Sequence, residues 1–402
     1  MHPIAIYTLT SSLHDEASVA GITDRFLGEI FPEGGYDFRG EDFTLFGDHP
    51  VDLIFVRTGG TEGIFRDLLP GLLDAGIRRF NLLTSGKSNS LAASMEILSY
   101  LRGQGLEGEI IHGKPESVRK RIGKIMQVEE TLERLRSTCL GVIGHPSDWL
   151  IASGTDYQKI YEKLGIWLED IPMEELLEAI KESRCHEEIP EAAGGNLSVR
   201  DAFPGAVRIH EALKTLIVKH NLQGLTLRCF DLLGAVGNTG CLALARLNAD
   251  GIPAGCEGDI PALLSMTIAR AATGSSGFQA NPSRIDTETG EMVLAHCTIP
   301  LDLVSDYTFD THFESGIGVG IRGHFPEGPV TLFKVSGDLN RFFIAEGELI
   351  RNLSEPDLCR TQIAVRLDSA DTEYFLHNPI GNHHIVLPGH HKQLLTAILN
   401  RI

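Results

Sequence analysis

The sequence predicts an α/β protein in which two doubly wound parallel-sheet domains precede a β-rich, barrel-like domain. Short apolar strands alternate with helical segments over the first two thirds of the chain, which is typical of a parallel sheet with helices on both faces. After about residue 276 the helical periodicity fades, and apolar segments separated by Gly and Pro indicate antiparallel strands. A chain of 402 residues is also long for one hydrophobic core. We therefore expect three domains, over residues 1–136, 137–275 and 276–402.

The first predicted domain alternates strands with helices. Its expected strands are Ile4–Leu9, Val51–Val56, Phe80–Leu83 and Glu109–Ile111, and its expected helices cover residues 14–30, 61–76, 88–104 and 115–136. The last helix carries Lys, Arg and Glu at spacings of three and four, as a solvated helix face does. The Gly-Lys-Ser run at residues 86–88 lacks the first glycine of a phosphate-binding loop. We interpret it as an ordinary turn in which Ser88 caps the next helix.

The second and third predicted domains differ in their expected secondary structure. For the second we expect strands at residues 140–144 and 224–230, and helices at 173–183, 206–220 and 259–273, the last after a turn that contains Glu257. For the third we expect strands at residues 292–299, 328–339, 341–344 and 360–366, and a terminal helix near 389–400. The third unit is therefore predicted to be a largely antiparallel sheet or barrel.

The composition limits the partners and the compartment. A net charge of −19 argues against nucleic acid or an anionic membrane as the main partner, because both require clustered Lys and Arg. The seven cysteines are odd in number and form no Cys-x-x-Cys pair, which predicts the reduced thiols of a cytoplasmic protein. The first residues do not resemble a signal peptide, and no apolar run approaches the ~20 residues needed to span a bilayer.

Acidic, amide and imidazole side chains gather at boundaries between apolar runs and turns in the last third of the chain. They are Glu257, Asn281, His296 and the adjacent His383 and His384. Because open α/β sheets place functional residues at the carboxyl ends of strands, a site at a domain junction could collect this set. Oxygen and imidazole ligands suit a divalent cation such as Mn²⁺ or Mg²⁺ better than structural zinc, which prefers thiolates. The sequence therefore predicts a metal-assisted enzyme.

Each of these residues also has a structural interpretation. Glu257 could begin a helix, where a carboxylate is favoured by the helix dipole. Asn281 before Pro282 is a common turn pair, and His296 on an apolar strand could be a core histidine. His383 and His384 face opposite sides of an extended chain, so at most one of them points at a given site, and we favour His383.

The motifs taken together resemble the L-fucose isomerase and L-arabinose isomerase superfamily. The runs that carry the resemblance are Cys256-Glu257-Gly258-Asp259, Ala280-Asn281-Pro282, Ala295-His296-Cys297-Thr298, Gly381-Asn382-His383-His384 and residues 329–338. The resemblance covers the whole chain and implies two flavodoxin-like domains followed by a barrel-like domain. It further implies an aldose–ketose isomerase that acts on a monosaccharide or modified sugar through an enediol, as a homotrimer or homohexamer.

The resemblance also implies a ligand set for Mn²⁺ or another divalent cation. Glu257 matches the first carboxylate of the family and would serve as both ligand and base. Asn281 stands where the family has a second carboxylate, His296 matches a histidine of the arabinose branch, and His383 matches the late histidine. A cation that contacts two neighbouring sugar oxygens polarises the carbonyl, and a positioned base contributes about 10²–10⁴-fold.

Asn281 is the departure from the family that matters. An amide oxygen can ligate a hard cation but cannot accept a proton, and the lost negative charge lowers the expected metal affinity. Either another group supplies the second base, or Glu257 acts alone, or the chain no longer isomerises. Glu314, Asp259 and Asp286 are candidates for the second base, and we favour Glu314 because a Gly-containing turn follows it.

Three further residues are predicted to contact substrate. Trp149 lies in a loop after a strand and offers a surface on which a sugar could stack, or is a half-buried aromatic. Arg57 and Ser88 lie in turns of the first domain, and in the family that domain leans over the site of a neighbouring subunit. We therefore expect Arg57 and Ser88 to reach substrate across a subunit interface.

Two other functions stay open. Asn281 favours a sugar-binding or regulatory relative with degraded catalysis, which metal analysis and an isomerisation screen would distinguish from an enzyme. The other is a different metal-dependent reaction on a related sugar, such as epimerisation, which solvent deuterium at C2 without ketose would indicate.

Overall fold

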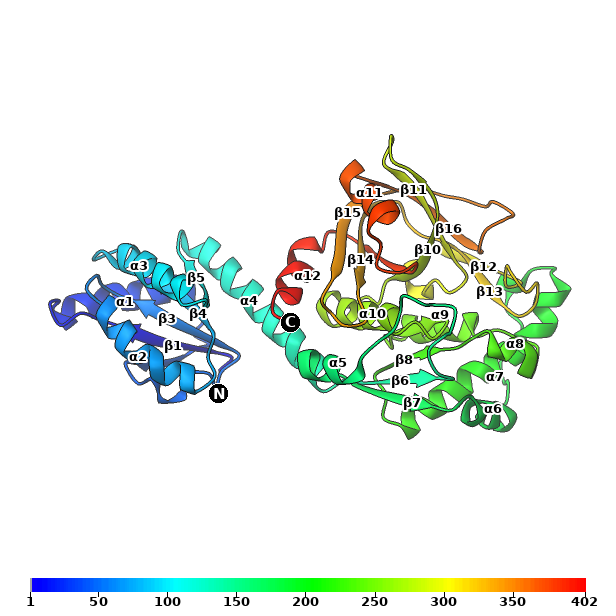
Figure 1. The fold of residues 1–402 in the computed structure, drawn as a ribbon, viewed down its shortest axis with the longest axis horizontal. Coiled ribbons are helices and arrows are strands. Elements are labelled where there is room, and N and C mark those ends of the chain that lie inside the picture. Colours follow the sequence, from blue (N-terminus) through cyan, green and yellow to red (C-terminus); the bar gives the residue numbers. More distant parts are fainter. Residues whose placement is uncertain (1) are drawn as a thin grey trace. The chain divides into compact units, whose positions relative to one another are not determined.

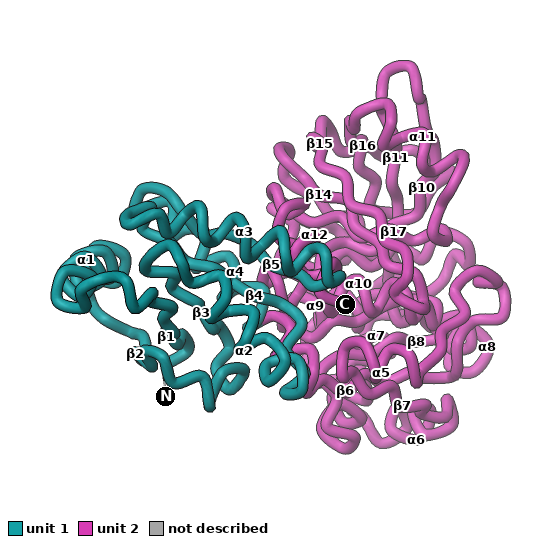
Figure 2. The backbone as a smooth tube through the Cα atoms, turned by 60° about the vertical axis from the view of Figure 1, so that its left-hand side comes forward, with its two compact units in different colours: residues 1–130 teal, residues 131–402 magenta. Residues whose placement is uncertain are grey.

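The computed structural model describes residues 2–402. The chain divides into two compact units, Met1–Glu130 and Thr131–Ile402 (Figure 2). The predicted boundary near residue 275 falls inside the second unit, between a helix and the first barrel strand, so the division into three domains stays a prediction. Within the described residues, no helix combines the length and the apolar character required to cross a membrane.

The first unit is built on a five-stranded parallel sheet with the strand order β2-β1-β3-β4-β5. This is the flavodoxin-like order, in which the first strand lies between the second and the third. The strands are β1 Ile4–Leu9, β2 Asp37–Gly40, β3 Val51–Val56, β4 Arg79–Thr84 and β5 Glu107–Ile111. Strands β1, β3, β4 and β5 can be followed in Figure 1. The helices are α1 Glu16–Ile30, α2 Glu62–Asp74 and α3 Ser90–Gly103, with a 3₁₀ turn at Phe43–Leu45, and α4 Pro115–Arg136, which continues into the second unit from Thr131.

Both faces of this sheet are covered, as predicted. Because side chains alternate along a strand, Ile4 and Ile6 of β1 pack into a core with α1 and α4, whereas Ala5 and Tyr7 pack into a second core with α2 and α3. The four predicted strands are confirmed. β2 was not predicted, because this short edge strand is polar and only partly buried.

The second unit begins with a four-stranded parallel sheet in the order β7-β6-β8-β9. Its strands are β6 Cys139–Ile143, β7 Trp167–Ile171, β8 Gly224–Leu227 and β9 Ala254–Cys256. Its helices are α5 Tyr157–Leu164, α6 Met173–Glu182, α7 Leu197–Lys219, α8 Asp231–Val236, α9 Cys241–Ala249 and α10 Ile260–Thr273, with a 3₁₀ turn at Glu191–Ala193. Helix α7 begins nine residues earlier than predicted, because the Asn196 side chain caps it and Pro204 is accommodated inside it.

The rest of the second unit is a closed antiparallel barrel with the strand order β10-β11-β16-β15-β14-β17. The barrel strands are β10 Phe278–Asp286, β11 Glu291–His296, β14 Gly328–Val335, β15 Phe342–Asn352, β16 Thr361–Leu367 and β17 His384–Pro388. A separate hairpin of β12 Asp306–Asp310 and β13 Gly320–His324, a 3₁₀ turn at Leu301–Leu303, and helices α11 Ser369–His377 and α12 Lys392–Leu399 complete it. The predicted fold class, two doubly wound sheets followed by a barrel, is confirmed.

Helix α10 connects the parallel sheet to the barrel. It is buried on nearly all sides, as expected of a helix between two layers. It packs against β8 and β9 of the sheet and against β14 and β17 of the barrel. Figure 1 shows α10 with β8 on one side and β14 on the other. The turn before α10 therefore lies where the carboxyl end of β9 meets the barrel.

His220 at the end of α7 provides a pH-dependent link in the second unit. Its Nδ1 lies 2.6 Å from Glu169 of β7 and its Nε2 lies 2.7 Å from Glu175 of α6. The hydrogen bond to Glu175 has the largest effect and raises the pKa of His220, burial opposes the rise, and Glu169 adds to it. The stabilisation of the fold by protonated His220 is therefore fully present below the unfolded-state pKa of about 6.5. It is lost as the pH rises through the raised folded-state pKa.

We expect His220→Gln to lower the unfolding free energy by about 1 kcal/mol at pH 6, because partly exposed hydrogen bonds to charged groups are lost. The difference from wild type should shrink at pH 9, and urea unfolding at both pH values measures it. His377→Gln is the matched control, since His377 forms an exposed pair with Glu373. An equal loss at both pH values would contradict the prediction.

Candidate metal centre

Glu257 occupies a tight turn between β9 and α10, as the sequence predicted. Glu257 and Gly258 both have a left-handed backbone, each with φ of 62°. Asp259 caps α10, because its Oδ1 accepts from the backbone N–H of Ala262 at 2.9 Å. The Ser147 hydroxyl donates to the carbonyl oxygen of Glu257, and the Gly258 N–H donates to Leu227 at 3.0 Å. These two hydrogen bonds hold the turn from both sides, so the backbone that carries the Glu257 side chain is fixed in place.

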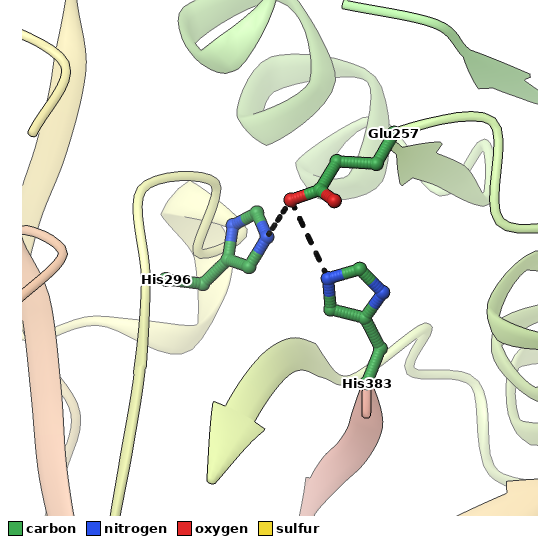
Figure 3. Close-up of side chains that lie close together, drawn as sticks. All are labelled: Glu257, His296 and His383. Atoms are coloured by element: carbon green, nitrogen blue, oxygen red, sulfur yellow. Dashed lines mark ion pairs between the residues drawn. The ribbon is translucent and has the colours of Figure 1, made fainter. Parts of the chain in front are cut away.

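Two barrel histidines converge on this carboxylate. His296 is the last residue of β11 and His383 directly precedes β17, so both are supplied by the ends of barrel strands. The Oε1 atom of Glu257 lies 3.7 Å from Nε2 of His296 and 3.5 Å from Nε2 of His383 (Figure 3). One ligand atom of each residue lies within 4.8 Å of the other two. The structure thus brings together three of the four predicted metal ligands.

The surroundings of the two imidazoles suit a cation. The Nδ1 atom of His296 lies 2.9 Å from the Thr298 hydroxyl, and Nδ1 of His383 lies 2.8 Å from Oδ2 of Asp259. Both Nε2 atoms are buried and have no hydrogen-bond partner among residues 2–402. Ligand atoms around one cation at about 2.1 Å lie roughly 3–3.6 Å apart, close to the distances of 3.5 and 3.7 Å between Glu257 Oε1 and the two imidazole nitrogens. The three residues therefore fit a divalent ion, with the second nitrogen of each imidazole held by a neighbour.

The charges of the site are strongly coupled. Burial alone would raise the pKa of Glu257, but His296 and His383 outweigh it and lower that pKa below its ordinary value. Burial opposes charge on His383, yet Asp259 and Glu257 raise its pKa to about 9. Burial also opposes the ionised form of Asp259, but Lys334, at 3.4 Å, and His383 lower its pKa. Both carboxylates are therefore ionised at neutral pH.

The side chains of His383 and His384 face opposite sides of the chain, as predicted. His384 is also buried, but its Nε2 lies 3.1 Å from the Tyr374 hydroxyl and its ring packs against Phe375. Burial lowers the pKa of His384 to about 3. His383 therefore faces Glu257, while His384 faces an aromatic cluster on the other side of the strand.

Asn281 lies inside β10 and not in a turn. It pairs with Ala295, the neighbour of His296, and its Oδ1 accepts from the Asn382 side chain at 3.0 Å. Asn382 in turn precedes His383. Asn281 thus pairs with or bonds to the sequence neighbour of each histidine, and its role as a neutral ligand stays a prediction.

A row of three rings in contact extends from the Glu257 carboxylate. We call this row, Trp149, Phe230 and His312, the aromatic wall. The indole N–H of Trp149 donates to Oε2 of Glu257 at 3.3 Å, and its ring meets Phe230 edge-on at 5.4 Å between centroids. His312 packs edge-on against Phe230 at 5.8 Å, and its Nδ1 lies 2.9 Å from the Ser315 hydroxyl. Burial lowers the pKa of His312. Trp149 was predicted from the sequence, whereas Phe230 and His312 were not, although His312 stands two residues before the predicted Glu314.

The remaining predicted site residues have these positions. Glu314 is exposed in the turn after His312. Arg57 is buried in the first unit, where its guanidinium bonds to Thr10, Thr23 and Glu16. The catalytic role of Glu314 and the substrate contacts by Trp149, Arg57 and Ser88 stay predictions.

The expected capping role of Ser88 is wrong. Helix α3 begins at Ser90 after Asn89, and the Asn89 side chain forms no capping hydrogen bond with the described residues. Ser88 itself has a left-handed φ of 51°, and its carbonyl oxygen accepts from Gly59. A capping residue normally has extended backbone, so the conformation of Ser88 excludes that function.

Comparisons with known proteins identify two relatives with the same name. The chain is 24% identical over 291 residues to a protein named sulfoquinovose isomerase from Alkalicoccus urumqiensis. It is 27% identical over 241 residues to another sulfoquinovose isomerase, from Clostridium sp. (strain MSTE9). These matches cover 68% and 56% of this chain, but only 64% and 51% of the length of the relatives. No protein-family model matches the chain.

Proposed function

We propose that this protein is a metal-dependent aldose–ketose isomerase that acts on a monosaccharide or modified sugar. The observation that carries the proposal is the convergence of Glu257 with two buried imidazole nitrogens that lack hydrogen-bond partners in the described part of the chain. The names of the two relatives support isomerase chemistry on a sugar. The order of motifs that resembles the fucose and arabinose isomerases supports the same reaction type.

In this proposal Glu257, His296 and His383 hold the cation through Oε1 and the two Nε2 atoms, and Asn281 adds a neutral oxygen. A bound divalent cation would supply a Lewis acid that polarises the sugar carbonyl. Mn²⁺ is our choice, because two imidazoles with one carboxylate suit a transition metal better than Mg²⁺, which prefers oxygen ligands.

The two oxygens of Glu257 have different surroundings, which suits a second role for this residue. Oε1 faces the imidazoles, whereas Oε2 faces the Trp149 indole. We propose that Oε2 accepts the proton that moves between C1 and C2 of the sugar, and that the Trp149 indole positions the sugar. Glu314 is proposed as the second acid or base, because it follows His312 at the end of the aromatic wall.

Removal of the metal tests the proposal. We expect EDTA-treated protein to lose its isomerase activity and Mn²⁺ to restore it, because the cation both polarises the carbonyl and completes the site. ¹H NMR of aldose and ketose in a panel of pentoses, hexoses and acidic hexoses, with sulfoquinovose included, measures turnover. Metal content by mass spectrometry serves as the control. Undiminished turnover without metal, or none on any sugar with metal bound, would contradict the proposal.

A second candidate function rests on Asn281. No carboxylate stands at this position, and its amide oxygen already accepts a bond from Asn382. This favours a sugar-binding or regulatory protein in which catalysis is degraded. Calorimetric sugar binding without ketose formation in the same panel would support it over the isomerase.

The state of the protein in the cell is proposed from the family resemblance and the cysteine usage. We propose a cytoplasmic homotrimer or homohexamer. Light scattering on the purified protein measures its oligomeric state.

A further inference from the structure

Lys334 is a lysine buried in the second unit. Its side chain is 1% exposed, and along β14 it shares a strand face with Val330 and Leu332 of the barrel core. Burying an ammonium group costs several kcal/mol unless a partner compensates it. Its partner is Asp259, whose Oδ2 lies 3.4 Å from Nζ and whose side chain is 0% exposed.

Asp259 is fixed from three elements at once. Its Oδ1 accepts from the Ala262 N–H at the start of α10. Its Oδ2 is shared by Lys334 of β14 and by Nδ1 of His383 at 2.8 Å, which precedes β17. An ionised carboxylate can only accept, so the His383 nitrogen that faces Asp259 carries the proton. The other nitrogen, Nε2, is then directed at Glu257.

We propose that Lys334 is a positioning residue of the metal centre: it holds the Asp259 carboxylate in the place from which that carboxylate orients His383. This inference rests on the proposed function, because it needs the site to bind a metal. Lys334 itself touches neither Glu257 nor either imidazole among the contacts of residues 2–402, so it acts through Asp259. A carboxylate bonded to the second nitrogen of a metal-ligating histidine, as Asp259 is here, generally contributes about 10–100-fold to metal affinity.

A purely structural role makes a different prediction. The Lys334–Asp259 pair also ties β14 to the start of α10, so its loss could lower stability alone. In that case the unfolding free energy would fall while the metal affinity of the folded protein stayed unchanged. Metal affinity measured on folded protein is therefore the informative readout.

The test uses calorimetric titration of Mn²⁺ into metal-free, full-length protein, with circular dichroism as a check of folding. We expect Lys334→Met to weaken Mn²⁺ binding by at least about tenfold. Lys163→Met is the matched control: that lysine bonds to Leu339 and Asn340 beyond the end of β14, and its variant should bind Mn²⁺ like wild type. The visible spectrum of bound Co²⁺ should also change in Lys334→Met, because it reports the ligand geometry.

A double variant tests whether Lys334 acts through Asp259. Asp259→Asn and Asp259→Asn/Lys334→Met should bind Mn²⁺ equally within about twofold, because the lysine then has no carboxylate to position. Additive losses would overturn the proposal, as would wild-type affinity in Lys334→Met. If Lys334→Met does not fold, Lys334→Gln replaces it, and failure of both to fold would assign Lys334 to the fold instead. Wild-type protein that binds no Mn²⁺, Co²⁺ or Zn²⁺ would reject the proposed function itself.

Discussion

Replacing Glu257 with glutamine is expected to reduce kcat/KM by at least about 10³-fold, because it removes both the one acidic ligand and the proposed base. The amide has nearly the same shape as the carboxylate, so the turn and its contact with Trp149 should persist. Both imidazoles would keep their partners Thr298 and Asp259. NMR assays of isomerisation and titration of Mn²⁺ measure the two losses separately.

The control for this variant is Glu355→Gln. Glu355 forms a surface ion pair with Arg284, so its loss should leave both turnover and metal affinity unchanged. Activity of Glu257→Gln within tenfold of wild type, with normal circular dichroism, would remove Glu257 from the mechanism.

Gly258→Ala is expected to disrupt the site through the backbone. The φ of Gly258 is +62°, and an added Cβ would lie 2.8 Å from the carbonyl oxygen of His145 and 3.1 Å from the backbone nitrogen of Ser147. These are backbone atoms of the loop that holds Glu257, so neither can move without moving the carboxylate. We expect a loss of about 3 kcal/mol in unfolding free energy from strain and overpacking, together with loss of Mn²⁺ binding.

Gly274 provides a control at the other end of the same helix. Its φ is +82°, but an added Cβ would meet no atom of residues 2–402 within 4 Å. Gly274→Ala should therefore cost only the backbone strain, about 1 kcal/mol, and leave metal affinity unchanged. Chemical denaturation and Mn²⁺ titration of both variants measure the difference. Equal effects in both would show that steric contact with the 145–147 loop is unimportant.

Local sequence patterns predicted the parts of the site that depend on short-range geometry. Glu257 lies in the expected turn because Asp259 is a strong N-cap and Pro261 suits the first turn of a helix. His383 and His384 point to opposite sides because side chains alternate along extended chain. These outcomes require only neighbouring residues.

The sequence was a poor guide where distant strands decide the structure. Asn281-Pro282 has the composition of a turn, yet it lies in β10, where Pro282 sits beside an irregularity in the pairing with β11. Strand β17 was not predicted either, although it is largely apolar; it pairs with β10 and β14 and thereby closes the barrel. Pairing partners far along the chain supply the hydrogen bonds that local propensity does not predict.

By itself, the sequence determined the alternation of strands and helices, the change to a β-rich region, and the residues able to bind a cation. Tertiary structure alone decided which of them meet, because closing the barrel carries His296 and His383 to the end of β9. It also decided that a lysine stands behind Asp259, since a buried charge is stable only where folding provides its partner.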